Sequence, residues 1–236
     1  MTAGAHDATP PPRRRDARRN RELLVEAAHE VFGELGLDAP LDVIARRAGV
    51  GNATLYRHFP TRVALVDAVF HDQLTGTMSA GEQARTAPDA WTGLTGYLDA
   101  VFTVLATDRG TNDLMTTSLK GVDALETVHA HNRRTLEELL ERGRAEGSVR
   151  PDVTAEDVLF ALAALGRAVP ALMTAVSAAD AWRRPLALFL DGLRPAPAAP
   201  PLPSPALTAD QLAATLGELG PHRGAAWPVS PAPKRT

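Results

Sequence analysis

The segment NATLYRH concentrates hydrogen-bonding side chains in seven residues, five of which carry such groups: Asn52, Thr54, Tyr56, Arg57 and His58. Amide, hydroxyl, guanidinium and imidazole groups at this density are unusual on a helix whose only role is packing. They suit a helix laid in the major groove of DNA, where base edges and phosphates require donors and acceptors. The plainer alternative is a tight corner in a helical protein.

Two short helices are expected to position these side chains. The stretch LDVIARRAGVGNATLYRHF, residues 41–59, begins with an amphipathic segment that Gly49 ends. A second short helix follows from about Asn52 to Phe59, and Pro60 ends it. Two helices joined by a glycine-bearing turn form a helix-turn-helix.

The segment from Arg19 to Leu74 resembles the N-terminal domain of TetR-family transcriptional regulators. The resemblance is carried by AGVGNATLYRHFPTRVAL, residues 48–65. It implies an all-α fold: a three-helix DNA-binding head, a fourth helix that links it to a helical ligand-binding and dimerisation body, and a homodimer on an operator. Thr61 is expected to cap the fourth helix.

The resemblance also suggests roles for individual residues. Thr54 and Tyr56 match positions that meet phosphates, and His58 and Arg62 match positions that face the DNA backbone. His58 could equally pack between helices. Asn suits adenine, Arg suits guanine and a methyl group suits thymine, so the candidates for base reading are Asn52, Ala53 and Arg57.

A basic run precedes this head. Residues 13–21 read RRRDARRNR, with Arg18 and Arg19 as candidate DNA contacts. A solvated terminus is the default reading of such a run. Its place directly before a DNA-binding head favours contact with phosphates or a groove.

Composition supports a helical protein and excludes several classes. Of 236 residues, 44% are apolar, a single isoleucine occurs, and alanine and leucine are abundant. The chain has no cysteine, which excludes disulfides, thiolate zinc sites and a cysteine nucleophile. The net charge of −3 confines any nucleic-acid role to a local patch. Motifs for catalysis, metal binding or phosphate-binding loops are missing, so we expect neither an enzyme nor a cofactor.

The expected organisation has four parts. Residues 1–16 form a disordered basic arm, 17–74 the DNA-binding domain, 75–193 the body, and 194–236 a Pro/Ala-rich tail with one possible short helix. Residues 75–88 are expected to be looser than their surroundings. No segment reaches the length of a membrane span and no secretory signal is visible, so we expect a cytoplasmic protein that does not contact membranes.

The body is expected to enclose a pocket for an unknown small-molecule effector, between the helices of residues 89–147. His129 and Asn132 fall on the apolar stripe of their helix, where a buried polar group needs a partner. A closed core is the alternative. The full set of expected lining residues is Trp91, Leu98, Phe102, Leu114, Met115, His129 and Asn132.

Residues 155–193 are expected to form the dimer interface. The helix over residues 155–177 is apolar on nearly all sides, which suggests a partner beyond the monomer core. Two helices from each subunit would make a four-helix bundle. The expected interface residues are Val158, Leu162, Leu165, Val169, Leu172, Trp182, Leu186, Phe189 and Leu190.

The sequence therefore favours a homodimeric repressor that a small, largely apolar ligand releases from a palindromic operator. A helical protein-binding or scaffold module without an effector is the alternative.

Overall fold

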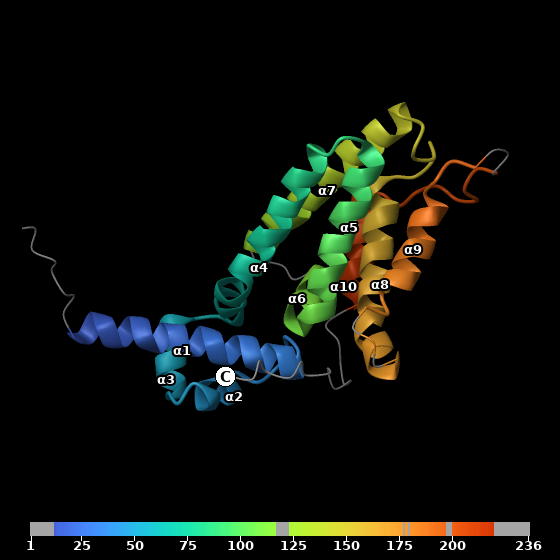
Figure 1. Ribbon diagram of the computed structural model, residues 1–236. Coiled ribbons are helices and arrows are strands. Elements are labelled where there is room, and N and C mark those ends of the chain that lie inside the picture. Colours follow the sequence, from blue (N-terminus) through green and yellow to red (C-terminus); the bar gives the residue numbers. More distant parts are fainter. Residues whose placement is uncertain (1–11, 117–122, 177, 179, 197–199, 220–236) are drawn as a thin grey trace, which may run out of the picture.

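The computed structural model describes residues 12–116, 123–176, 178, 180–196 and 200–219, and these residues form ten α-helices. Figure 1 shows a small head, built from the first three helices, and a longer helical bundle that we call the body. The described residues contain no strand. The fold is all-α, as the sequence predicts.

The head contains α1 (Pro12–Leu35), α2 (Leu41–Arg47) and α3 (Asn52–His58), and α4 (Arg62–Arg85) runs from it along the body. The body adds α5 (Ala90–Thr107), α6 (Arg109–Thr116), α7 (Asp123–Ala145), α8 (Ala155–Val176) and α9 (Arg183–Gly192). The last helix, α10 (Ala209–Leu219), lies against α8.

The first helix begins earlier than the sequence indicated. Residues 1–16 were expected to form a disordered arm, but α1 starts at Pro12, so the expected arm is wrong for residues 12–16. Proline suits the first turn of a helix, since its fixed φ is helical and its missing N–H has no intrahelical partner there. Arginine is a good helix former, which carries the helix through the basic run. The expected arm over residues 1–11 lies outside the described residues.

The head is held by one small apolar core. Phe32 on α1, Ile44 on α2 and Leu55 on α3 are all at most 1% exposed and belong to the same cluster. Gly36 ends α1 with φ 82°, and Gly49 ends α2 with φ 69°. Both glycines adopt the left-handed conformation that the sequence-based helix ends require.

The linking helix is longer than expected. It was expected to end near Leu74 before a looser stretch, but α4 continues to Arg85, and the boundary drawn after residue 74 falls inside it. A Cβ at Gly81 would lie 2.5 Å from His131 Nε2, so α4 and α7 approach closely there. Arg85 Nη1 also donates to Thr135 Oγ1 at 2.7 Å. Because Gly81 lets α4 pack closely against α7, α4 continues to Arg85 although it has no clear apolar stripe.

Three helices meet at Phe70 of α4, which is fully buried. Its ring stacks on Phe32 of α1 with centroids 6.1 Å apart. A Cβ at Gly110 of α6 would lie only 2.4 Å from Phe70. Gly110 lies in the first turn of α6, where its missing side chain makes room for the ring.

The helix ends of the body follow the sequence. Asp89 caps α5 by accepting from Thr92 N at 2.7 Å. Before α8, Thr154 N donates to Asp157 Oδ2 at 2.9 Å and Asp157 N donates to Thr154 Oγ1 at 3.3 Å, and the two bonds form a capping box. Pro185 lies in the first turn of α9, where proline is tolerated.

Among the described helices, α8 alone is long and apolar enough to cross a membrane. It packs against α5, α6, α7, α9 and α10. These contacts identify it as a core helix of the body.

Two glycines of α5 provide a matched test of this packing. A Cβ at Gly93 would lie 2.4 Å from the Ala84 carbonyl oxygen, whereas nothing lies within 4 Å of one at Gly96. Gly93→Ala is expected to lower the free energy of unfolding by about 1–3 kcal/mol, because backbone must shift. Gly96→Ala is expected to raise it by about 0.5–1 kcal/mol through helix propensity. Denaturant unfolding measures both, and equal effects would contradict the close α4–α5 contact.

Candidate nucleic-acid interface

The third helix separates its side chains into two faces. Asn52, Ala53 and Arg57 are exposed, and Tyr56 is 52% exposed. Leu55, in contrast, is 1% exposed and anchors α3 in the head core. Four residues predicted to meet DNA therefore share an outward surface, which we call the reading face.

The other two α3 candidates lie at the edges of this surface. Thr54 and His58 are half-buried. The His58 ring lies 6.5 Å from that of Phe59, which is 2% exposed. His58 therefore has the packing contact that the sequence left open.

Short backbone links fix the turn that presents α3. Val50 N donates to the Ala45 carbonyl at 3.0 Å, and Leu55 N donates to the Gly51 carbonyl at 3.2 Å. Neither Pro40 nor Gly51, the residues that precede α2 and α3, makes a side-chain cap. The turn is held by these bonds and by apolar packing.

Arg62 has a different position from the one expected. The sequence placed it at the DNA backbone, but its Nη1 donates to the carbonyls of Leu37 and Ala39, both at 2.7 Å. These carbonyls belong to the turn between α1 and α2, which helical hydrogen bonds do not satisfy. Arg62 thus braces the head from the first turn of α4. Thr61 caps this helix, with Ala64 N donating to Thr61 Oγ1 at 3.1 Å.

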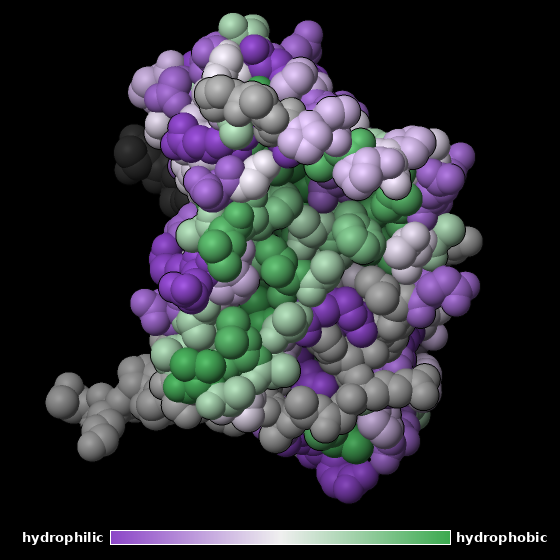
Figure 2. All heavy atoms as spheres, turned by 90° about the vertical axis from the view of Figure 1, so that its right-hand side faces the viewer, coloured by the Kyte–Doolittle hydropathy of each residue, from purple (hydrophilic) through white to green (hydrophobic). Residues whose placement is uncertain are grey.

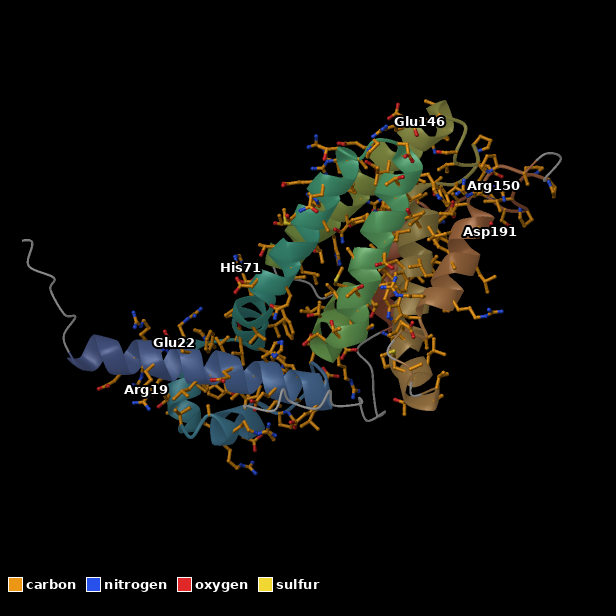
Figure 3. The ribbon with its side chains drawn as sticks, in the orientation of Figure 1. Arg19, Glu22, His71, Glu146, Arg150 and Asp191 are labelled. Atoms are coloured by element: carbon orange, nitrogen blue, oxygen red, sulfur yellow. The ribbon has the colours of Figure 1, made fainter. Side chains whose placement is uncertain are left out.

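The basic residues of α1 lie on an exposed helix. Arg18 and Arg19 are both exposed, and Figure 3 shows Arg19 and Glu22 projecting from α1. Arg18 Nε lies 3.3 Å from Glu22 Oε1. Both arginines remain available to phosphates, presented by a helix and not by an arm.

A cluster of ion pairs that the sequence did not reveal joins α2 to α1. Arg47 lies 3.1 Å from Glu30 and 2.9 Å from Glu34. Hydrogen bonding to Arg47 lowers the pKa of the Glu34 carboxyl. Because the three groups are 39–53% exposed, water screens the pairs and their contribution to stability is small.

The head touches the body through His29 of α1 and Asp108, which precedes α6. His29 Nε2 lies 3.0 Å from Asp108 Oδ2. The hydrogen bond to Asp108 raises the pKa of His29 against the opposing effect of burial. Burial alone would raise the pKa of Asp108, but hydrogen bonds from His29 and Thr111 outweigh it and lower the pKa. The pair is therefore charged at mildly acidic pH.

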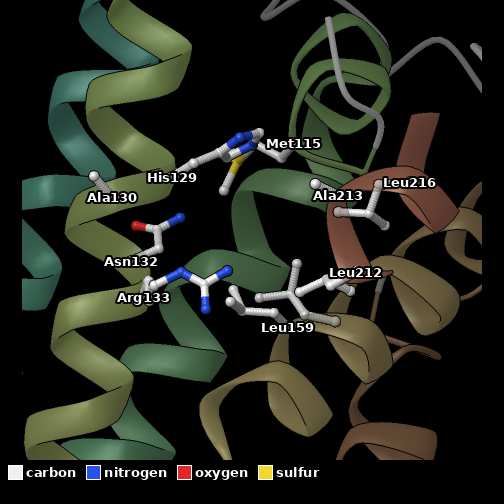
Figure 4. Close-up of a pocket in the computed structure, with 10 residues that line it drawn as sticks. Met115, His129, Ala130, Asn132, Arg133, Leu159, Leu212, Ala213 and Leu216 are labelled. Atoms are coloured by element: carbon white, nitrogen blue, oxygen red, sulfur yellow. The ribbon is translucent and has the colours of Figure 1, made fainter. Parts of the chain in front are cut away.

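The body contains a cavity of about 190 Å³, shown in Figure 4. Of the predicted effector residues, Met115, His129 and Asn132 line it. Leu98, Phe102 and Leu114 are at most 2% exposed in the core, and Trp91 packs under Arg194 at 4.0 Å. Leu162, which the sequence assigned to the dimer interface, also lines the cavity. The other lining residues were not predicted: Ala130, Arg133, Leu159, Leu212, Ala213 and Leu216.

The polar groups of the cavity come from one helix. His129 is largely buried, and burial, with Arg133 nearby, lowers its pKa, so the ring is neutral at neutral pH. Asn132 is 4% exposed, and its Oδ1 has no hydrogen-bond partner among the described residues. Arg133 Nη1 is hydrogen-bonded to Glu156 of α8. A buried amide oxygen without a partner is costly in a closed core, which favours a binding site.

The face of α8 and α9 turned away from the body carries an apolar patch (Figure 2). A groove of about 710 Å³ runs along it, lined by Leu165, Val169, Leu172 and Trp182 of the predicted interface. Val176 and Leu188, which were not predicted, are 54% and 66% exposed there. Val158, Leu162 and Leu186 are at most 5% exposed and belong instead to the monomer core. Phe189 and Leu190 are half-buried.

An exposed polar helix on a compact three-helix head, joined to a helical body, defines a helix-turn-helix DNA-binding protein. Residues 24–69 match the family described as bacterial regulatory proteins of the tetR family, and residues 88–195 match the SbtR-like transcriptional regulator C-terminal domain. The chain belongs to the TetR family of transcriptional regulators, a family of DNA-binding proteins and not of enzymes.

The chain is also similar to individual proteins and solved structures. A TetR transcriptional regulator from Streptomyces coelicolor is 31% identical over 75% of this chain and 99% of its own, with a TM-score of 0.49. A tetR-family regulatory protein from Rhodococcus is 21% identical over 75% of this chain and 98% of its own, with a TM-score of 0.60. An HTH-type transcriptional regulator from Staphylococcus aureus is 45% identical over 47 residues, 20% of this chain and only 25% of that protein.

The contact between His29 and Asp108 gives a pH-dependent prediction. Because folding raises the pKa of His29, the ion pair contributes fully to stability below the pKa of an unfolded histidine, near 6.5. This contribution is lost as the pH rises through the pKa of His29 in the folded protein. His29→Ala is therefore expected to lower the free energy of unfolding more at about pH 5.5 than at about pH 8.5. The difference should stay under about 1 kcal/mol, since His29 is 41% exposed.

His71→Ala, which removes an exposed histidine from α4, is the control. Urea unfolding at the two pH values measures both variants. A His29→Ala effect that is the same at both pH values would contradict a charged pair at this junction.

Proposed function

We propose that the protein is a homodimeric repressor that binds a roughly palindromic operator through α3 and is released by a small, largely apolar ligand. The observation that carries DNA reading is the exposed face of α3, with Asn52, Ala53, Tyr56 and Arg57 outward and Leu55 buried behind them. In this proposal Arg57 and Asn52 read base edges, and Tyr56 and Thr54 bind phosphates.

The exposed arginines of α1 extend the contact. Arg18 and Arg19 would lie over phosphates beside the groove, where they displace counterions. Arg62 is removed from this set, because its Nη1 bonds to the α1–α2 turn support a bracing role. Two heads would read half-sites about one helical turn, ~34 Å, apart or a multiple of that.

Selection from random duplex DNA tests the proposal, and an enriched palindromic motif is the expected result. Against the selected site, Arg57→Ala is expected to cost about 1–3 kcal/mol and to relax specificity at one position. Tyr56→Ala should weaken all sites alike, because phosphates carry no sequence. Affinity should fall steeply with salt.

Arg134→Ala, which removes an exposed arginine from α7 in the body, is the charge-matched control. It should leave DNA affinity unchanged. A selection that enriched no motif would exclude an operator-binding repressor and favour a scaffold module whose head contacts protein.

The apolar patch on α8 and α9 supports dimerisation. A groove lined by Leu165 and Leu172, with Leu188 and Val176 exposed beside it, would leave a large apolar area in water in a monomer. A second copy of the same two helices would cover it in a two-fold bundle.

Leu188→Glu is expected to split this dimer, because it places a charge in the apolar interface. The substitution should leave the monomer folded, since Leu188 is 66% exposed. Leu35→Glu, at another leucine that is 52% exposed, is the control and should leave the dimer intact. Sedimentation at micromolar concentration measures both, and a wild type that sediments as a folded monomer would rule out the interface.

Effector release follows from the position of the cavity. Met115, at the end of α6, lines it, and Asp108, just before α6, contacts His29 of the head. A ligand that displaces α6 would therefore bear on α1, and through α4 would change the spacing of the two heads. The ligand must bind the DNA-incompetent arrangement better, and a tenfold loss of operator affinity requires about 1.4 kcal/mol of coupling.

A further inference from the structure

The wall of the cavity opposite α7 comes partly from the end of the chain. Leu212, Ala213 and Leu216 of α10 line the cavity together with Leu159 and Leu162 of α8. Figure 4 shows α10 facing α7 across it. Leu212 is 2% exposed, so α10 is seated by an apolar contact. This helix lies beyond residues 88–195, the segment that matches the body of the family.

The segment before α10 is attached to the end of the body that lies far from the head. Figure 3 labels Arg150 at this end. Arg150 Nη2 donates to the Pro200 carbonyl at 3.2 Å, and Leu202 N donates to Asp152 Oδ2 at 2.8 Å. Hydrogen bonds from Arg150 and from Leu202 N lower the pKa of Asp152 to about 2. The segment is therefore held by hydrogen bonds at Pro200 and Leu202 and by the apolar contact of Leu212 on α10.

The polar side of the cavity carries several hydrogen-bond donors beside Asn132 Oδ1, a buried acceptor without a partner among the described residues. His129, Asn132 and Arg133 lie at i, i+3 and i+4 on α7, so they share one face of the helix. A neutral imidazole, an amide and a guanidinium each offer N–H groups. Arg133 uses one nitrogen on Glu156, and a guanidinium has five N–H groups in total. This face suits a ligand head group that accepts hydrogen bonds.

The cavity limits the size of the ligand. Small-molecule sites usually measure roughly 300–1,000 Å³, and an apolar cavity of about 150 Å³ holds one benzene molecule. At about 190 Å³, this cavity takes an apolar body of roughly eight carbons while α10 is docked.

We propose that α10 is the outer wall of the effector site and restricts it to short ligands with an apolar body of about eight carbons and one carboxylate head group. The carboxylate accepts hydrogen bonds from the α7 face, and the body packs against Leu159, Leu212 and Leu216. This inference rests on the proposed effector response and adds the ligand class and the element that sets ligand length.

Straight-chain alkanoates from butanoate to dodecanoate test the proposal by calorimetry on the full chain without DNA. The dissociation constant should fall about fourfold for each added methylene. This gain should stop near octanoate in the wild type. In the double variant Leu212→Ala, Leu216→Ala it should continue to dodecanoate, because the wall has been cut back. Circular dichroism checks that the variant keeps its helices.

Two neighbouring alanines of α10 supply a matched pair. Both are exposed, but Ala213 lines the cavity and Ala214 does not. Ala213→Phe fills the cavity and is expected to weaken octanoate binding at least tenfold. Ala214→Phe should bind octanoate as the wild type does.

Four results would each overturn the inference. The same chain-length profile in the wild type and the double leucine variant would exclude α10 as the wall, as would equal binding by the two phenylalanine variants. 1-Octanol binding as tightly as octanoate, or no binding of any alkanoate, would exclude the carboxylate class. Since these measurements contain no DNA, their failure leaves operator binding standing, and a failed operator selection leaves them unaffected.

Discussion

The contact between Phe70 and Gly110 fixes how the head sits on the body, and the other features depend on it. Phe70 belongs to α4, stacks on Phe32 of α1, and occupies the space that a side chain at residue 110 of α6 would need. One buried ring thus joins a head helix, the linking helix and a body helix. Because packed cores have discrete arrangements and resist continuous deformation, a shift of α6 must move Phe70 or be blocked by it. His29 and Asp108 add a polar contact at the same junction.

Arginines occupy both the proposed reading face and the supporting contacts of this head. Arg57 is exposed on α3, whereas Arg62 braces the α1–α2 turn and Arg47 forms exposed ion pairs between α2 and α1. Their side chains have the same chemistry, and only their surroundings separate the roles. A guanidinium can satisfy two carbonyls or two carboxylates at once because its donors are spread over a planar fork. The reading face therefore stands on a scaffold built from the same residue type.

The sequence predicted those features whose signal is local. The helix-turn-helix follows from residues 41–59, and Gly36 and Thr154 mark helix ends through backbone conformation and capping. The extension of α4 was missed because close packing on α7 depends on Gly81, which contributes no apolar stripe. The cavity was only partly predicted, since it joins Met115, Arg133, Leu159 and Leu212 from four helices. Periodicity shows that a residue is buried, but not whether it faces a core, a cavity or a groove.

α8 has more apolar residues than the monomer core alone requires, because these residues face three different surroundings. Leu162 faces the cavity, Leu165 and Leu172 face the open groove, and Val158 is in the monomer core. At its middle, Asn112 Nδ2 of α6 donates to the Gly166 carbonyl at 2.9 Å, and a Cβ at Gly166 would lie 3.0 Å from Thr116 Cγ2 of α6. α6 and α8 are therefore braced together between the cavity and the groove. A displacement of α6 that reaches the head must therefore also act on α8, so the groove and the position of the head are mechanically linked.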